Sequence, residues 1–416
     1  MENLIVWILN HYAGTKASPS TRHYDLAREF VRKGHKVTIF ASGFHYQKFV
    51  EERLRSDESS KQEYHDGVRF VWMRTFPYKG NEWRRVVNMI SYAWRAIFIG
   101  RKLEERPDVI IGSCVHPFAV LSAYILSRMK KSRFLFEVRD LWPQTLIDMG
   151  ALNNKSLIAW GLRKLEKFLY DKAEEIITLL PYADEYITGL GIPSKKIIWI
   201  PNGADLSRYR GVREYDGGMS KPFKIMYLGA HGRANALDVI IDAANIIQGK
   251  GLNNIRFIFV GDGPEKTHLI QYSEKKCLYN VEFRSAIPKN EISKVMGEAD
   301  AFMFNLEDLS LFKYGISSNK LFDYLASGRP ILFSGNAANN PVAEAAAGIS
   351  VPARAPKLLA NAVIDLINLK PEDRKIMGKN GLRYMRAKHD IRLLADRLEN
   401  VISRRIKIDT TRVKTT

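Results

Sequence analysis

Gly315-Ile-Ser-Ser-Asn-Lys-Leu-Phe-Asp-Tyr-Leu-Ala-Ser-Gly-Arg-Pro330 lies between two short apolar runs, 301–305 and 331–333. Apolar runs of this length are typical of parallel strands that are buried on both faces. The Ser-Ser-Asn sequence at 317–319 offers three candidate N-caps for a helix, and the apolar residues that follow lie on one helical face. Gly328 ends the helix and Pro330 prevents its continuation. The segment therefore predicts a strand–helix–strand unit of an α/β fold.

The start of this helix also predicts an anion-binding site. The free N–H groups of a first helical turn and the helix dipole point in one direction, and Ser318, Asn319 and Lys320 lie at that end. Asp323, one turn further along, is placed to accept hydrogen bonds from the hydroxyl groups of a sugar. The alternative at this point is an ordinary βαβ unit whose helix is well capped.

Length, composition and charge limit the class of protein. The 416 residues are enough for two domains, each with its own core, and 46% hydrophobic with 26% charged residues is typical of a globular protein. Cys114 and Cys277 are far apart and have neither metal-binding nor redox spacing, so we expect a reducing compartment. The formal net charge of +19 indicates an anionic partner: nucleic acid, acidic lipid or a diphosphate substrate.

The first half opens with the order of elements expected of a Rossmann-like domain. An apolar run at 4–9 is followed by a loop at 10–21, a helix at 22–33 and a strand at 34–41. The loop contains Gly14 as its only glycine, so it lacks the G-x-G-x-x-G pattern of dinucleotide sites. A loop of this length at the carboxyl end of a strand suits substrate binding.

The next segments bear on membrane contact. The charged stretch 51–66 predicts a solvent-exposed excursion before a strand at 68–72. The helix expected at 81–103 combines aromatic and basic residues, which favours contact with an anionic membrane surface; the alternative is a core helix with a solvated basic edge. The N-terminus carries no basic segment, and no apolar run reaches the ~18 residues of a membrane span. We therefore expect a cytoplasmic protein without a signal peptide.

Two polar segments follow later strands of the first half. The strand at 108–113 leads to His116, and the strand at 134–138 leads to Arg139 and Asp140. Open α/β sheets bind ligands at the carboxyl ends of their strands, so these residues are candidates for a cleft. A purely structural histidine is the alternative for His116.

The second half repeats the alternation of strands and helices. A polar segment at 211–222, which contains Gly217 and Gly218, predicts a linker before it. We expect five strand–loop–helix units, the last two around 301–333, and then a basic helical tail. The first three strands are expected at 223–228, 255–260 and 281–284, and glycine-containing loops at 229–235 and 261–264.

Five short motifs now stand in order along the chain. They are Pro201-Asn-Gly-Ala-Asp205, Tyr227-Leu-Gly229, Val260-Gly-Asp-Gly-Pro264, Ala299-Asp300 and Asn319-Lys-Leu-Phe-Asp-Tyr-Leu-Ala-Ser-Gly-Arg-Pro330. The series resembles the GT-B glycosyltransferases of family 4, and most closely the bacterial enzymes that build capsule and O-antigen repeat units, among them N-acetyl-L-fucosamine transferases. The resemblance covers nearly the whole chain.

The resemblance implies a fold and its domains. We expect an α/β protein of the GT-B type, with two Rossmann-like domains facing each other across a cleft and a C-terminal helical tail. The expected boundaries are 1–205 for the N-terminal, acceptor-side domain, 206–222 for the linker, 223–385 for the C-terminal, nucleotide-sugar-binding domain, and 386–416 for the last helix and tail.

The resemblance also implies an activity. Such enzymes transfer a sugar with retention from a nucleotide sugar, here expected to be UDP-linked, to a sugar carried on a polyprenyl diphosphate. They need no metal ion or other cofactor, since positive side chains and helix N-termini neutralise the diphosphate. The expected location is the cytoplasm, with peripheral attachment to the inner face of the cytoplasmic membrane. The site residues implied are His116 and Asp140 for catalysis, and Gly14, Arg233, Gly261, Gly263, Ile287, Ser318, Asn319, Lys320 and Asp323 for donor binding.

The chain departs from the family pattern at three positions. The first acid of the E-x7-E motif falls on Gly315, so the carboxylate that usually holds the donor sugar is missing. The family's basic loop residues fall on Ala230 and Asn235. Arg233 and Lys320 are the available substitutes for diphosphate binding. A donor such as an N-acetylated deoxyamino sugar is consistent with Gly315.

Two readings from other classes remain open at this stage. A sugar-nucleotide epimerase on the GT-B scaffold would convert a nucleotide sugar without any acceptor. A nucleic-acid-binding protein is suggested only by the net charge, and the chain has no helix-turn-helix, zinc-finger or RNP pattern. We therefore expect no nucleic-acid partner.

Overall fold

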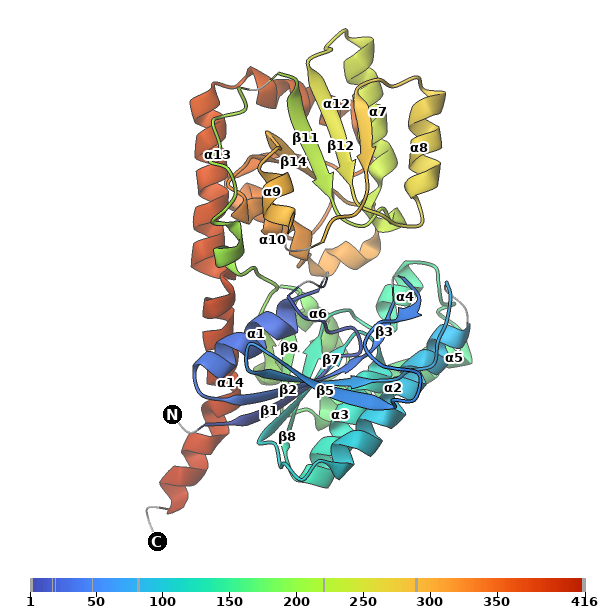
Figure 1. Cartoon of the computed structure of the whole chain (residues 1–416), viewed down its shortest axis with the longest axis vertical. Coiled ribbons are helices and arrows are strands. Elements are labelled where there is room, and N and C mark those ends of the chain that lie inside the picture. Colours follow the sequence, from blue (N-terminus) through green and yellow to red (C-terminus); the bar gives the residue numbers. More distant parts are fainter. Residues whose placement is uncertain are drawn as a thin grey trace. The chain divides into compact units, whose positions relative to one another are not determined.

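The computed structural model describes residues 3–16, 18, 20–46, 48–80, 83–219, 221–288 and 291–413. The chain forms two compact units (Figure 1): a first unit of Met1–Pro201 with Ile391–Thr416, and a second unit of Asn202–Asp390. Each unit is built around a mainly parallel sheet with helices packed against it. The expected α/β fold with two Rossmann-like domains and a helical tail is confirmed.

The sheet of the first unit has the strand order β10-β9-β8-β7-β1-β2-β6-β5. Neighbouring strands are parallel except at the edge, where β5 runs antiparallel to β6. A short antiparallel pair, β3 and β4, lies outside this sheet. The strands are β1 Ile5–Leu9, β2 Lys36–Ser42, β3 Phe44–His45, β4 Val50–Glu51, β5 Ser60–His65, β6 Val68–Met73, β7 Val109–Cys114, β8 Arg133–Val138, β9 Glu175–Thr178 and β10 Ile197–Trp199.

The helices of the first unit include the last helix of the chain. Leu394 and Leu398 of that helix are buried in the same core cluster as Phe30 of α1, so the tail completes the first unit. On another part of the sheet, α3 packs against both α2 and α5. The helices are α1 Arg22–Arg32, α2 Trp83–Lys102, α3 Pro117–Lys130, α4 Gln144–Asp148, α5 Leu157–Lys172, α6 Ala183–Gly189 and α14 Ile391–Val413.

The sheet of the second unit has the order β13-β12-β11-β14-β15-β16, with all neighbours parallel. Numbered within the unit, this is the order 3-2-1-4-5-6 of Rossmann domains, in which the direction of winding reverses between the first and fourth strands. The strands are β11 Phe223–Leu228, β12 Ile255–Val260, β13 Val281–Arg284, β14 Ala301–Asn305, β15 Ile331–Ser334 and β16 Gly348–Val351.

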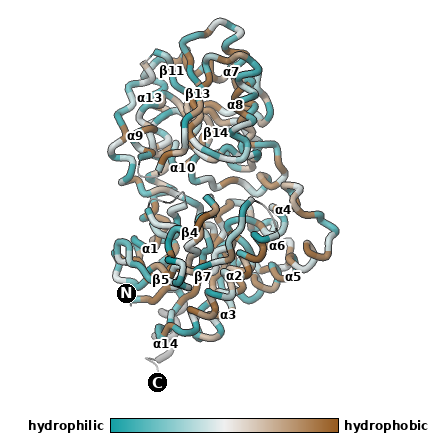
Figure 2. The backbone as a smooth tube through the Cα atoms, turned by 45° about the vertical axis from the view of Figure 1, so that its right-hand side comes forward, coloured by the Kyte–Doolittle hydropathy of each residue, from teal (hydrophilic) through white to brown (hydrophobic). Residues whose placement is uncertain are grey.

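The second unit buries its strands on both faces. Ile225 and Tyr227 of β11 enter one core cluster, and the alternate residues Met226 and Leu228 enter another. Figure 2 shows hydrophobic segments throughout both units. The helices are α7 Leu237–Gly249, α8 Lys266–Lys275, α9 Ile292–Met296, α10 Asn319–Ala326, α11 Pro341–Glu344, α12 Pro356–Asn368 and α13 Pro371–Tyr384, and a π-helical turn, Met385–His389, follows α13.

Two expectations about the elements were wrong in part. The charged stretch 51–66 is mostly exposed or half-buried, as expected, but it contains the strand β5, which pairs with β6 at the exposed sheet edge. The second half contains a sixth strand among the described residues, β16, beyond the five units expected. The helix expected from residue 81 begins at Trp83, and residues 81 and 82 lie outside the described residues.

The division into units differs from the expected domain boundaries at two places. The segment 206–222, expected to be a linker, lies within the second unit, where Tyr209 is buried in a core cluster. The segment expected as one tail, 386–416, divides between the units at Asp390 and Ile391. Among the described residues, no helix combines the length and apolar content needed to cross a bilayer.

Candidate active site

The second unit has a topological switch point between β11 and β14, and ligands of such sheets bind at the carboxyl ends of these strands. The segments that leave the two strands are tied together there. Nδ2 of Asn305, the last residue of β14, donates hydrogen bonds to the backbone oxygens of Asn235 (3.0 Å) and Ala236 (2.6 Å). The backbone N–H of Glu307 donates to the oxygen of Ala234 at 3.0 Å. The loop after β11 is therefore held against the end of β14.

Lys320 reaches into this position from the first turn of α10. Its Nζ donates to the hydroxyl of Tyr227 at 2.9 Å and to the side-chain oxygen of Asn235. Within the described residues, no carboxylate forms an ion pair with it. Burial lowers the pKa of the Lys320 ammonium to about 7. Lys320 is partly exposed, and a partly buried cation whose hydrogen-bond partners are neutral favours the binding of an anion.

The start of α10 supplies further hydrogen-bond donors beside Lys320. Ser318 is the N-cap residue, and its backbone oxygen accepts hydrogen bonds from the N–H groups of Leu321 and Phe322. Its side chain makes no capping hydrogen bond. The N–H groups of Asn319 and Lys320 have no acceptor within the helix, as at any helix start. The predicted anion cradle of Ser318, Asn319 and Lys320 therefore lies at the switch point.

The turn after β12 packs closely on the loop after β11. At Gly261, with a φ of +151°, a Cβ atom would collide with the backbone oxygen of Gly229. At Gly263 a Cβ atom would lie 2.5 Å from the backbone oxygen of His231. Both glycines are therefore required by backbone contact, whatever they do for a ligand.

His231 was not anticipated by the sequence analysis. It is fully buried, and neither ring nitrogen has a hydrogen-bond partner within the described structure. Burial, together with the charge of Lys266, lowers its pKa to about 4, so the ring is neutral at pH 7. The signal that could have indicated it is an aromatic polar residue between the two glycines of a loop at a strand end, Gly229 and Gly232.

The other second-unit residues predicted to bind the donor and not yet described are Asp323, Ile287 and Arg233. Asp323 accepts a hydrogen bond from the hydroxyl of Tyr209. Ile287, in the loop after β13, packs against the core cluster that contains α10. Arg233 is exposed in the short 3₁₀-helix η3 Arg233–Asn235.

Gly315, where the family pattern has an acid, occupies a special backbone conformation. It ends the 3₁₀-helix η5 Ser310–Tyr314 with a φ of 88° and a ψ of −175°. Residues with a Cβ atom rarely adopt this region. The missing carboxylate therefore accompanies a backbone conformation that favours glycine.

The first unit has its own switch point, between β1 and β7, and His116 lies there. Its Nδ1 accepts a hydrogen bond from the backbone N–H of Ala119 at 3.2 Å, which makes His116 the N-cap of α3. Nε2 therefore carries the proton and donates to Nδ1 of His11 at 2.8 Å. Burial, with a smaller contribution from Arg85, lowers the pKa of His116 to about 3. The ring is buried and neutral, with both nitrogens hydrogen-bonded.

Gly14 and Asp140 both belong to the first unit, in the segments that follow β1 and β8. A Cβ atom at Gly14 would clash with the side chain of Ser18, so glycine lets the loop after β1 fold back on itself. Asp140 follows β8 and is exposed. Gly14, His116 and Asp140 thus belong to the first unit, and the other predicted site residues belong to the second.

A buried ionic network in the first unit was also missed. The carboxylate of Glu137 accepts hydrogen bonds from Nε of Arg22 (2.9 Å), Nε2 of His23 (2.6 Å) and the hydroxyl of Ser113 (2.7 Å). These partners outweigh the effect of burial and hold the pKa of Glu137 well below its usual range. The network fixes the end of the loop 10–21 against β8. An acid inside the apolar strand 134–138 was its signal in the sequence.

Solved structures with the same fold cover almost the whole chain. Sucrose-phosphate synthase from Thermosynechococcus elongatus is 14% identical with a TM-score of 0.74, and the match covers 98% of this chain and 100% of that one. HepE from Anabaena, solved in complex with UDP and glucose, is 13% identical with a TM-score of 0.67 and coverages of 96% and 100%. At these identities the likeness is one of fold.

Sequence comparisons give the family. The chain is 21% identical over 332 residues to "Probable glycosyltransferase WbjE" of Pseudomonas aeruginosa, a match that covers 74% of this chain and 80% of the relative. Residues 19–203 match the model of the glycosyl transferase 4-like domain, and residues 222–369 match that of the glycosyl transferases group 1. With two glycosyltransferase domain models matched in order on two Rossmann-like units, the chain belongs to the GT-B glycosyltransferases.

Proposed function

We propose that this glycosyltransferase moves a sugar from a UDP-linked donor, with retention and without a metal ion, to a lipid-linked sugar acceptor. The observation that carries the donor half is the ammonium of Lys320, which lies at the switch point of the second unit beside the start of α10 and has only neutral partners. A diphosphate supplies the missing counter-charge. The structure of HepE with UDP and glucose has the same fold and supports UDP as the nucleotide.

The diphosphate can be neutralised by the protein alone in this proposal. Lys320 and the free N–H groups lie on the first turn of α10, and exposed Arg233 on η3 is the second cation proposed to bind the diphosphate. Asp323 would hold the ribose hydroxyls, in exchange for its bond to Tyr209. The turn 261–263 and Ile287 would form the wall beside the nucleotide.

The donor sugar is proposed to be an N-acetylated deoxyamino sugar such as N-acetyl-L-fucosamine. Gly315 supplies no carboxylate for the hydroxyl groups of a hexose, which favours a sugar that lacks one of them. Asp140, an exposed acid that follows β8, is proposed to take part in catalysis. His116 is enclosed, so its contribution to catalysis passes through the ring of His11, to which it donates.

The acceptor is proposed to be a sugar on a polyprenyl diphosphate, as an intermediate of capsule or O-antigen synthesis, reached from the cytoplasmic side of the membrane. Such an acceptor requires contact with the bilayer. In α2, Trp83 and Trp94 are 68% and 66% exposed, and α5 begins with Leu157, which is 87% exposed. Exposed aromatic side chains on basic helices favour an anionic membrane interface. α2 also has a buried face that includes Met89 and Tyr92, as the core-helix alternative predicts, but that alternative does not account for the exposed tryptophans.

Thermal unfolding with nucleotides tests the donor assignment. UDP and the matching UDP-sugar should raise the melting temperature, since a ligand at about 100 times its Kd stabilises the folded state by ~2.7 kcal/mol. ADP and GDP at the same concentration should raise the melting temperature less than UDP does. If neither UDP nor any UDP-sugar raised the melting temperature, the assignment of UDP as the donor nucleotide would be refuted.

A further inference from the structure

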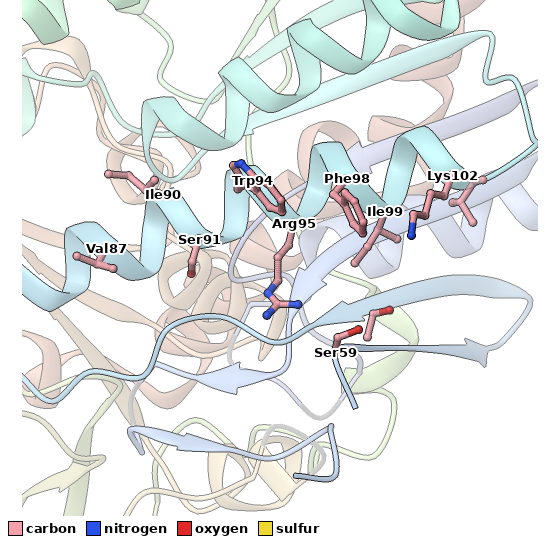
Figure 3. A pocket seen from close by; sticks show the side chains of 11 residues that line it. Ser59, Val87, Ile90, Ser91, Trp94, Arg95, Phe98, Ile99 and Lys102 are labelled. Carbon is pink, nitrogen blue, oxygen red and sulfur yellow. The ribbon is translucent and has the colours of Figure 1, made fainter. Parts of the chain in front are cut away.

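A groove runs along the outer side of α2. It has a volume of about 560 Å³ and lies between this helix and the start of β5, where Ser59 and Ser60 form the facing side (Figure 3). Its helical wall includes Ile90, Trp94 and Phe98, which follow one another at intervals of one helical turn. The rings of Trp94 and Phe98 are stacked, with centroids 5.5 Å apart. The groove is therefore largely apolar and open on the surface of the first unit.

Two cations line the same groove. Figure 3 shows Arg95 extending from α2 toward the segment that carries Ser59. Nζ of Lys102 lies 4.1 Å from the centroid of the Phe98 ring. In the part of the chain that is described, neither Arg95 nor Lys102 forms an ion pair with a carboxylate, and α2 itself contains no acid.

The neighbouring acids form no ion pair with these cations among the described residues: Glu105 pairs with Arg69, and Glu104 pairs with neither Arg95 nor Lys102. The side chain of Glu58, adjacent to Ser59, accepts a hydrogen bond from the backbone N–H of Arg55 at 2.9 Å and is thus engaged within its own turn. The groove consequently combines an apolar floor with uncompensated positive charge. An occupant needs a hydrocarbon part and an anionic head.

We propose that this groove binds one hydrocarbon chain of an anionic phospholipid, with the lipid phosphate against Arg95 and Lys102. The proposal rests on the membrane contact proposed above and makes it a defined lipid site. From Val87 to Lys102 the helix rises by ~22 Å, which exceeds the ~15 Å of one leaflet's hydrocarbon, so a lipid chain fits along it. A second copy of this chain is a poor occupant, because its net charge of +19 opposes the two cations.

A groove that binds one lipid molecule can be distinguished from a general attraction of the protein to charged surfaces. Interfacial attraction adds up over the basic residues of a helix and needs a vesicle surface. A groove recognises a single lipid molecule in solution and is blocked by a side chain that fills it. The probe is therefore monomeric dihexanoyl phosphatidylglycerol, below its micelle concentration, with dihexanoyl phosphatidylcholine as the zwitterionic comparison, measured by titration calorimetry.

Two pairs of variants separate the interpretations. Ser59→Phe fills the groove without changing charge, and Ser56→Phe is its control, since Ser56 is exposed nearby but does not line the groove. Arg95→Gln with Lys102→Gln removes the two groove cations. Arg84→Gln with Arg101→Gln removes the same charge from exposed positions of the same helix outside the groove.

The wild type should bind the phosphatidylglycerol monomer with a stoichiometry of one, and the phosphatidylcholine more weakly. Ser59→Phe and the Arg95/Lys102 pair should each weaken this binding at least ~10-fold, while both controls bind as the wild type. The proposed lipid site would be refuted if the wild type did not bind the phosphatidylglycerol monomer, or if Ser59→Phe bound it as tightly as the wild type does. UDP affinity, measured on the same samples, shows that each variant is folded and reports separately on the donor site.

Discussion

Raising the pH from 7 to 8.5 should weaken UDP binding through Lys320. Its ammonium has a pKa of about 7 in the free protein because burial disfavours its charged form, and its hydrogen-bond partners are neutral. A bound diphosphate favours the charged form and raises this pKa. UDP binding must therefore take up a proton wherever free Lys320 is neutral, and affinity falls as the pH rises.

The size of the effect follows from the fraction of charged Lys320. About half of the molecules are charged at pH 7 and about 3% at pH 8.5, so the affinity should fall roughly 15-fold if the bound pKa lies above this range. The phosphate groups stay ionised throughout, because their second pKa is about 6. Replacing Lys320 by Met removes a charged hydrogen bond worth ~1.5–3 kcal/mol, or roughly 10- to 150-fold in affinity at pH 7.

Titration calorimetry of UDP binding at pH 7 and 8.5, in buffers of different ionisation enthalpy, measures both affinity and proton uptake. The wild type should lose affinity and take up protons as the pH rises, whereas Lys320→Met should bind weakly and with no pH dependence. Lys313→Met, an exposed lysine of the same connection, should behave as the wild type. Equal pH dependence in the wild type and Lys320→Met would refute the assignment of Lys320 to the diphosphate.

Other substitutions test the remaining parts of the site. His116→Ala should lower turnover at least ~10-fold and leave UDP affinity within about twofold, because His116 belongs to the first unit. A wild-type kcat in this variant would show that His116 acts only as the N-cap of α3. His231→Leu should stabilise the free protein by ~1–3 kcal/mol, because it removes a buried polar ring without partners, and a lower melting temperature would argue against this. Glu137→Gln should destabilise the protein by ~3–5 kcal/mol in urea unfolding, because Arg22 then loses its buried counter-charge; a change below ~1 kcal/mol would contradict that.

The sequence predicted those parts of the fold that depend on local signals. The strand, helix start and glycine stop around 301–330 are all local, and β14, α10 and β15 occur where expected. β5 was missed because its residues alternate charged and polar types at a sheet edge, so no apolar pattern marks them. The position of α14 against α1 could not be predicted, because it depends on contacts between the two ends of the chain.

The candidate site was predictable to the level of segments. Lys320, Ser318 and Asn319 were predicted from cap and charge patterns, and in the structure they lie at a switch point. His231 was missed because its importance lies in the absence of hydrogen-bond partners, which only packing determines. The enclosure of His116 was missed for a similar reason: a strand-end position does not reveal that the side chain turns inward to cap α3.

The measurement that tests the proposed activity most directly follows a labelled sugar from a UDP-linked donor in the presence and absence of lipid-linked acceptor. Label should move into the lipid fraction with an equal amount of free UDP, only when acceptor is present, and Lys320→Met should reduce this transfer. Conversion of the nucleotide sugar without acceptor and without release of UDP would contradict the account and indicate a sugar-nucleotide epimerase instead.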